Sequence, residues 1–197
     1  MAIATVLLLH PLLIALDAPL VVVGLLDWSA HLATAVLVLV NLPLALPGRM
    51  LVAALLASVV IDLDHIPHYL GEQFLTAGAP RPYTLSLVSV IAALAVAAVL
   101  RRPAHRAIAV GVALGLLAHL ARDVSTGPGI ALLWPLTSAG VRIPFWVEAA
   151  ALAALATRGW VLADRLPLIG ARRTRRREDA GRALGRARRP GTHRHVP

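Results

Sequence analysis

Cysteine is absent from this chain of 197 residues. The absence excludes disulfide bonds and thiolate ligands, so any bound metal must be held by histidine, aspartate or glutamate. Charged residues are also scarce, at 15% of the chain, whereas 58% of the residues are hydrophobic and the mean hydropathy is +0.76. These values are typical of a protein that crosses a membrane several times, and they leave no room for a large soluble domain.

The positive charge gathers at the C-terminal end. The net charge is +9, and ten arginines lie between Arg172 and Arg194. We therefore predict a transmembrane helical domain over 1–170 and a basic, disordered cytoplasmic tail over 171–197. Such a tail is expected to contact anionic lipid headgroups, whereas binding to nucleic acid is disfavoured. Four tryptophans near predicted helix ends are expected to be interfacial anchors: Trp28, Trp134, Trp146 and Trp160.

The apolar segments predict an all-α bundle of about six membrane-spanning helices. The first segment, 3–26, has no basic leader or cleavage motif, so we expect no signal peptide. Pro11 and Pro19 interrupt it, which indicates one kinked span or two half-helices. Ser29 is then a candidate N-cap for a second helix that ends near Leu46. The other predicted helices cover 49–62, 84–100, 104–122 and 145–163, with polar loops at 69–82 and 124–144.

The arginines outside the tail predict the orientation of this bundle. With six crossings, Arg49 and the turn 101–106 fall on the same side as the tail, which the positive-inside rule makes cytoplasmic. Both termini are then cytoplasmic, whereas Arg81 and Arg142 fall on the opposite side and depart from the rule. The opposite side collects the acidic and histidine side chains Asp27, His31, Asp62, Asp64, His65, His68, His119 and Asp123. This coincidence predicts one shared polar site near the outer membrane face.

The segment 62–68, Asp-Leu-Asp-His-Ile-Pro-His, places four ionisable side chains directly after an apolar helix. Carboxylates and imidazoles are ligands for divalent metals, and a charge at membrane depth is costly unless it is paired, hydrated or metal-bound. An acidic helix end before a proline turn is an equally good interpretation of the segment alone. A helix over 50–61 would cover about 18 Å of a hydrocarbon core of about 30 Å, so we expect Asp62 to lie below the outer surface.

His119 and Asp123 are four residues apart on a predicted helix, so they share one face. They can bind one ion together, or the aspartate can orient the histidine. An aspartate at the C-terminal end of a helix is unfavourable beside the helix dipole unless it has a partner. His31 is a lone histidine in an apolar helix, for which a packing role and a ligand role are comparable.

The order and spacing of these residues resemble the YdjM-like family of bacterial inner-membrane proteins, which are assigned as metal-dependent hydrolases. The resemblance extends to about residue 163. It rests on His31 in Ala-His-Leu-Ala-Thr, on Asp62-Leu-Asp64-His65, on His119-x-x-x-Asp123-x-x-Thr126, and on Gly127-Pro-Gly129 leading to Leu133-Trp134-Pro135. It implies a multi-helix membrane protein with a His/Asp metal centre, whose ligands are similar to those of zinc-dependent phospholipases C.

One segment departs from the family pattern. The family commonly has a His-Arg-Gly-x-Thr-His-Ser motif where this chain has Arg81-Pro-Tyr-Thr84-Leu85-Ser86. Leu85 stands where a histidine is expected, and no histidine opens the motif. The change removes one or two metal ligands or a general acid/base, for which His65 or His68 are candidate replacements.

The residues and the resemblance together predict a membrane-bound hydrolase that uses water activated by a divalent metal, expected to be zinc. The expected substrate is a lipid or lipid-linked phosphoester. Two alternatives remain: an inactive membrane protein with a residual His/Asp cluster, and a small transporter that relays ions along its aspartates. The candidate metal ligands are His31, Asp62, His65, His119 and Asp123. Asp64 and His65 are the candidate catalytic residues, and Asp64 is alternatively a ligand.

Overall fold

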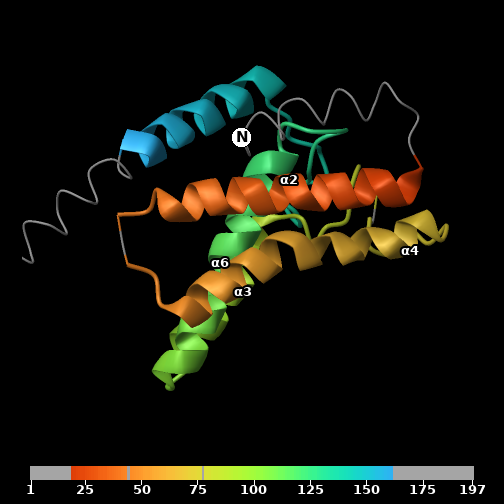
Figure 1. Ribbon diagram of the computed structural model, residues 1–197. Coiled ribbons are helices and arrows are strands. Elements are labelled where there is room, and N and C mark those ends of the chain that lie inside the picture. Colours follow the sequence, from red (N-terminus) through yellow and green to blue (C-terminus); the bar gives the residue numbers. More distant parts are fainter. Residues whose placement is uncertain (1–18, 44, 77, 162–197) are drawn as a thin grey trace, which may run out of the picture. The chain divides into compact units, whose positions relative to one another are not determined.

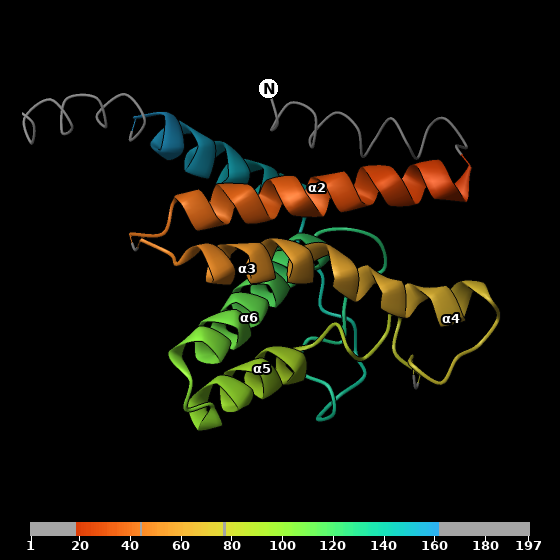
Figure 2. The ribbon, with the colours of Figure 1, turned by 60° about the horizontal axis from the view of Figure 1, so that its bottom comes forward.

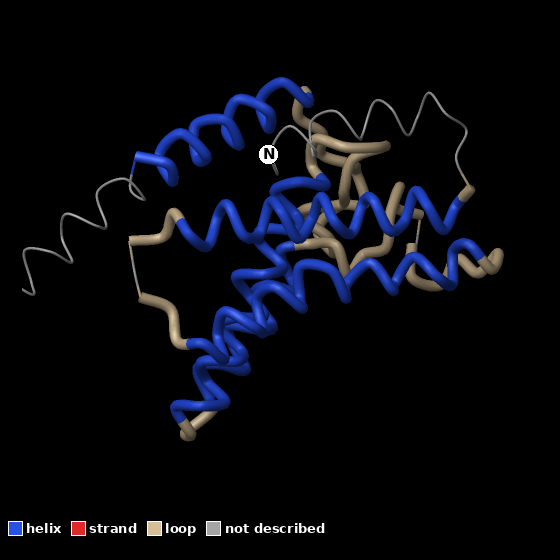
Figure 3. Tube along the Cα trace, viewed as in Figure 1, coloured by secondary structure: helices blue, strands red, loops and turns tan. Residues whose placement is uncertain are grey.

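The computed structural model describes residues 19–43, 45–76 and 78–161. Within these residues the chain is helical, and the β-structure is limited to one isolated antiparallel bridge between Ile130 and Val141 (Figure 3). The described residues up to Ala156 form one compact unit, and 157–161 belong to a second one. Most of the first predicted span and the arginine-rich tail lie outside the described residues.

Helix α2 covers Leu20–Val40 without a break (Figure 1). The predicted helix start at Ser29 is therefore wrong: Ser29 lies inside α2, and its hydroxyl donates to the carbonyl three residues earlier at 2.7 Å. Asp27 does not interrupt the helix because its carboxylate finds a partner on another helix, 3.0 Å away at Arg122. The predicted end at Leu46 is also wrong, because α2 ends at Val40.

The acidic segment continues the helix that precedes it. Helix α3, Gly48–Val60, is followed directly by a 3-10 turn, Ile61–Asp64. The short helix α4, His65–Tyr69, comes next and continues the same helical path (Figure 2). The helical path is therefore longer than the predicted 49–62. The stretch Gly48–Pro67 is long and apolar enough to cross a membrane, so Asp62 lies within a candidate span.

Three described helices are long and apolar enough to span a membrane, so the predicted six spans are not confirmed. They are α2, the α3–α4 stretch, and α6 at Pro103–Asp123, which agrees with the predicted 104–122. Helix α5, Leu87–Val99, has 13 residues and reaches only about 20 Å. A further helix covers 145–161.

Helices α3 and α6 cross in close contact because α6 carries glycine at the crossing. A Cβ atom at Gly111 would overlap the carbonyl oxygen of Met50, and one at Gly115 would overlap that of Ala54. Small residues of this kind let helix backbones approach closely. The order of these contacts also shows that the two helices run in the same direction, which brings the 3-10 turn after α3 to the C-terminal end of α6.

Leu85 lies in the hydrophobic core. It is 1% exposed and clusters with Val90 of α5, with Leu116 and Leu120 of α6, and with Ile130 of the following loop. The residue that departs from the family pattern therefore fills apolar space between α5 and α6. A second, smaller contact joins α2 to the helix over 145–161, where Ala30 packs near Leu152 and the Asn41 amide donates to the carbonyl of Leu155 at 2.9 Å.

Candidate metal centre

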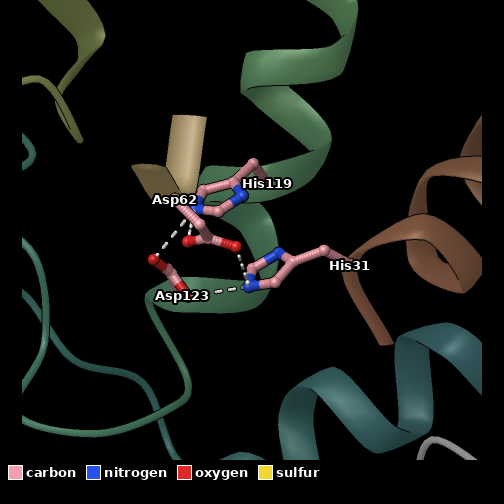
Figure 4. A group of neighbouring side chains, drawn as sticks. All are labelled: His31, Asp62, His119 and Asp123. Carbon is pink, nitrogen blue, oxygen red and sulfur yellow. Dashed lines mark hydrogen bonds and ion pairs between the residues drawn. The ribbon is translucent and has the colours of Figure 1, made fainter. Parts of the chain in front are cut away.

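Four side chains from three helical elements meet in one group, which we call the His/Asp group. His31 comes from the middle of α2, Asp62 from the 3-10 turn after α3, and His119 and Asp123 from the last turns of α6 (Figure 4). One ligand atom from each lies within 4.8 Å of all the others. The two histidines and Asp123 are buried, and Asp62 is partly buried.

The two imidazoles face the two carboxylates through their Nε2 atoms. His119 Nε2 lies 3.1 Å from Asp123 Oδ2 and 3.4 Å from Asp62 Oδ1. His31 Nε2 lies 3.4 Å from Asp123 Oδ1 and 4.0 Å from Asp62 Oδ2. Bonds of about 2.0–2.2 Å to one tetrahedral ion would place its ligand atoms about 3.3–3.6 Å apart. Three of the four separations are close to that range and the fourth, at 4.0 Å, is longer, so the four side chains would hold a small divalent cation after a slight contraction.

A carbonyl oxygen orients His119. The Nδ1 atom of His119 lies 2.9 Å from the carbonyl oxygen of Ser58. Ser58 is in the last turn of α3, directly before the 3-10 turn, so this contact fixes the His119 ring against α3. Because a carbonyl only accepts, the proton of a neutral His119 belongs on Nδ1, which leaves the Nε2 lone pair directed at the two carboxylates. The ring also stacks on His31, with centroids 3.9 Å apart and planes inclined by 10°.

His65, a predicted metal ligand, lies outside the His/Asp group. Its Nδ1 atom is 2.8 Å from Asp64 Oδ1 and 3.8 Å from Asp62 Oδ1. The other oxygen of Asp64 accepts a hydrogen bond from the Thr84 hydroxyl. Asp64 is thus held between Thr84 and His65, and the two predicted catalytic residues form a pair beside the group. We call Asp64 and His65 the Asp–His pair.

Two arginines that sequence reasoning did not assign to the site contact its acidic residues. Arg81 Nη1 lies 2.5 Å from Asp123 Oδ2. Arg122 is 1% exposed and lies 3.0 Å from Asp27 Oδ1 and 3.6 Å from Glu148 Oε1. The sequence does contain a clue to the role of Arg81, which is an exception to the positive-inside rule. A basic residue on the acidic side needs an acidic partner there. Glu148 is likewise conspicuous in the sequence, because it is an acidic residue within an apolar predicted helix.

The family model described as YdjM inner membrane protein matches residues 26–181, which is most of the chain. This protein belongs to the YdjM family. No curated protein and no solved structure matches it. Family membership and the three apolar helices identify an inner membrane protein, and its His/Asp group can bind a metal ion.

A cavity of about 370 Å³ opens beside the His/Asp group of this YdjM-family protein. Its polar lining comes from Asp27, Asp62, His65 and Arg81, and Trp28 contributes an aromatic wall. Asp62 therefore belongs both to the group and to the cavity. Trp28, which the sequence suggests as an interfacial anchor, also lines this cavity.

A second, apolar cavity of about 670 Å³ lies open at the surface along α3 and α6, where Leu56 is 59% and Val60 is 53% exposed. Alanine, leucine, valine and isoleucine side chains of both helices line it, including Leu56, Val60 and Leu116. Asp64 is its one charged lining residue. The Asp–His pair therefore lies between an apolar cavity on the side of Asp64 and a polar one on the side of His65.

Proposed function

We propose that this protein is a multi-pass, metal-dependent hydrolase of the inner membrane. The observation that carries the proposal is the convergence of four buried or partly buried N and O donors within 4.8 Å. We assign His31, Asp62, His119 and Asp123 as the ligands of one divalent ion. Zinc is the expected metal, because nitrogen and oxygen donors of histidine and aspartate are among its usual ligands; for hydrolysis, the ion would have to bind a water in addition to these side chains.

The charges around the group favour a bound cation. Five carboxylates lie in or next to it, and two guanidinium groups pair with them, which leaves three excess negative charges if the histidines are neutral. A divalent ion would reduce that excess to one. Buried charge without compensation is costly, most of all at membrane depth. The carboxylates are Asp27, Asp62, Asp64, Asp123 and Glu148.

The hydrolytic chemistry would divide between the ion and the Asp–His pair. A divalent ion supplies Lewis acidity and lowers the pKa of water toward about 7. His65 lines the cavity beside Asp62 and is placed to transfer a proton there. Asp64 acts through His65, because it lies 2.8 Å from Nδ1 and holds the ring in orientation. Thr84 in turn holds Asp64 by donating to its second oxygen.

The surroundings of the Asp–His pair support a lipid or lipid-linked phosphoester as substrate. The apolar cavity between α3 and α6 ends at Asp64, and the polar cavity begins at His65. A substrate with an apolar chain and a polar headgroup could occupy both, with its scissile bond near the Asp–His pair. An ordinary soluble polymer would leave the apolar cavity unused.

We further propose that the site faces the outer side of the membrane and that both termini are cytoplasmic. Arg49 lies in the first turn of α3 and Arg102 precedes α6, and these parallel helices carry their acidic residues at the other end. Basic residues favour the cytoplasmic side, so the His/Asp group would lie toward the opposite face. The arginine-rich tail would then contact anionic lipids of the cytoplasmic leaflet.

Metal content measured by mass spectrometry tests the assignment. The background is detergent-purified full-length chain carrying His193→Ala and His195→Ala, which removes adventitious binding by the tail. We expect about one equivalent of zinc, lost in Asp62→Ala and in His119→Ala and kept in the control His105→Ala. Zinc-dependent hydrolysis of phosphoester lipids should likewise be lost in Asp62→Ala and His119→Ala and kept in His105→Ala. No metal in the parent protein after reloading would sink the proposal.

The buried Leu85 favours a second candidate, an inactive family member that retains its metal. Its side chain packs in the core, where the family pattern has a histidine able to serve as ligand or acid/base. A protein that holds zinc in the His/Asp group but hydrolyses no phosphoester in a broad screen would support this alternative over the enzyme.

A further inference from the structure

Arg81 joins the His/Asp group to the polar cavity. Its Nη1 atom lies 2.5 Å from Asp123 Oδ2, the same oxygen that faces His119 Nε2 at 3.1 Å. The side chain also lines the cavity together with Asp62 and His65. Among the described residues that line this cavity, Arg81 is the only arginine or lysine.

The loop after α6 is shaped around the Arg81 guanidinium. Nη2 donates to the carbonyl of Thr126 at 3.4 Å. Gly127 follows with a φ of +58°, and a Cβ atom there would lie 2.5 Å from the same Nη2. Glycine is therefore favoured by the left-handed backbone, and the end of the Arg81 guanidinium lies where a side chain at position 127 would begin. Proline on both sides of Arg81 restricts the chain that carries it.

Arg81 keeps donors for a further ligand. A guanidinium has five N–H donors in a rigid plane, and Asp123 with the Thr126 carbonyl engages only two of its nitrogens. The planar fork matches two oxygens of a phosphate group. A neutral ester or amide at the same place would have no charge for Arg81 to recognise.

The acidic residues of the cavity do not prevent an anion from binding beside Arg81. Asp27 is paired with Arg122 at 3.0 Å. Asp62 faces His119 at 3.4 Å and belongs to the proposed ligand set, so its charge would be shared with the ion. The cavity therefore offers one preorganised cation next to carboxylates that already have partners.

We propose that the polar cavity is an oxyanion subsite in which Arg81 binds a phosphoryl group of the substrate. This inference rests on the proposed function and sharpens it, because it assigns a phosphate ester over a neutral ester or an amide. Arg81 is then the specificity-determining residue, and it would stabilise negative charge on the phosphoryl oxygens during hydrolysis.

Calorimetric titration of inorganic phosphate into the zinc-loaded, full-length protein in detergent tests the subsite. We expect phosphate affinity to fall by about tenfold to a hundredfold in Arg81→Gln and by a smaller factor in Arg81→Lys, as is typical for loss of charged hydrogen bonds. The control Arg142→Gln, at an exposed arginine of the loop after α6, should leave the phosphate affinity unchanged. Zinc content, measured first, should be the same in all four proteins.

Each contrary result has a distinct meaning. Equal phosphate affinity in the parent protein and Arg81→Gln would overturn the subsite, as would a zinc-loaded parent that binds no phosphate; both would leave the metal site standing. If Arg81→Gln loses zinc, Arg81→Lys decides: retained zinc with weaker phosphate binding supports the subsite. Loss of zinc in both variants would make Arg81 a positioning residue for Asp123 and overturn the subsite. A parent without zinc would overturn both this inference and the proposed function.

Discussion

The His/Asp group and the Asp–His pair use the same two residue types in different ways. The group draws its members from α2, the 3-10 turn and α6, and most of its atoms are buried. The pair consists of neighbours in sequence, Asp64 and His65, with Nδ1 and Oδ1 2.8 Å apart at the edge of a cavity. The group depends on how the helices pack, whereas the pair depends on one local turn. Changes to helix packing should therefore affect metal binding first, and changes to the pair should affect turnover alone.

The largest expected effect is the loss of metal in His31→Ala. His31 supplies one of the four assigned ligands from α2, and no other histidine of α2 could replace it. We expect zinc affinity, measured by competition with a chromophoric chelator, to fall by about a thousandfold. Leu32→Ala, at an exposed position of the same helix, is the control and should keep the parent affinity. An unchanged affinity in His31→Ala would remove His31 from the ligand set.

His65→Ala should separate turnover from metal binding. Since His65 lies outside the His/Asp group, zinc content should stay at the parent value. Loss of a general acid/base costs about a hundredfold or more, so the turnover number on a phosphoester lipid should fall by that factor. Loss of zinc from this variant would instead mean that His65 is a ligand, and the distinction between the group and the pair would fail.

Gly115→Ala tests whether the group depends on the approach of α3 and α6. The added methyl would overlap the Ala54 carbonyl, so we expect a loss of about 2 kcal/mol in unfolding free energy and weaker zinc binding. Gly24→Ala is the matched control, because nothing lies within 4 Å of a Cβ atom at that position of α2. Denaturation in mixed detergent micelles measures the unfolding free energy of both variants, and competition with a chromophoric chelator measures their zinc affinity. Equal stability of the two variants would show that the close crossing does not hold the site together.

The smallest expected effect is that of Thr84→Val. The change removes the hydroxyl that donates to Asp64 and leaves the His65–Asp64 contact in place. A hydrogen bond of this kind contributes about 1 kcal/mol, so turnover should fall by about fivefold to tenfold with zinc content unchanged. A variant as slow as His65→Ala would indicate that Thr84 acts directly on the substrate.

The helix content and the polar site could be predicted from the sequence, but several boundaries could not. Helix α6 matched its predicted range because its apolar run is continuous and Pro103 marks its start. The predicted break at Asp27–Ser29 was wrong because local rules treat an aspartate within an apolar run as an interruption. The carboxylate stays inside α2 because Arg122, far away in sequence, pairs with it. Residues 3–18 of the first predicted span and the tail lie outside the described residues, so those parts of the prediction stay untested, whereas residues 20–26 belong to α2.

The sequence by itself determined a membrane protein without thiolate chemistry, since its apolar runs and lack of cysteine follow from composition alone. It also determined the pairing of His119 with Asp123, because helical spacing places residues four apart on one face. Only the tertiary structure decided that His31 joins the group, that His65 lies beside it, and that Arg81 reaches Asp123. The physical reason is that contacts between elements depend on how closely and in which direction the helices cross. Glycine at the α3–α6 contact sets that approach, and spacing along the chain does not reveal it.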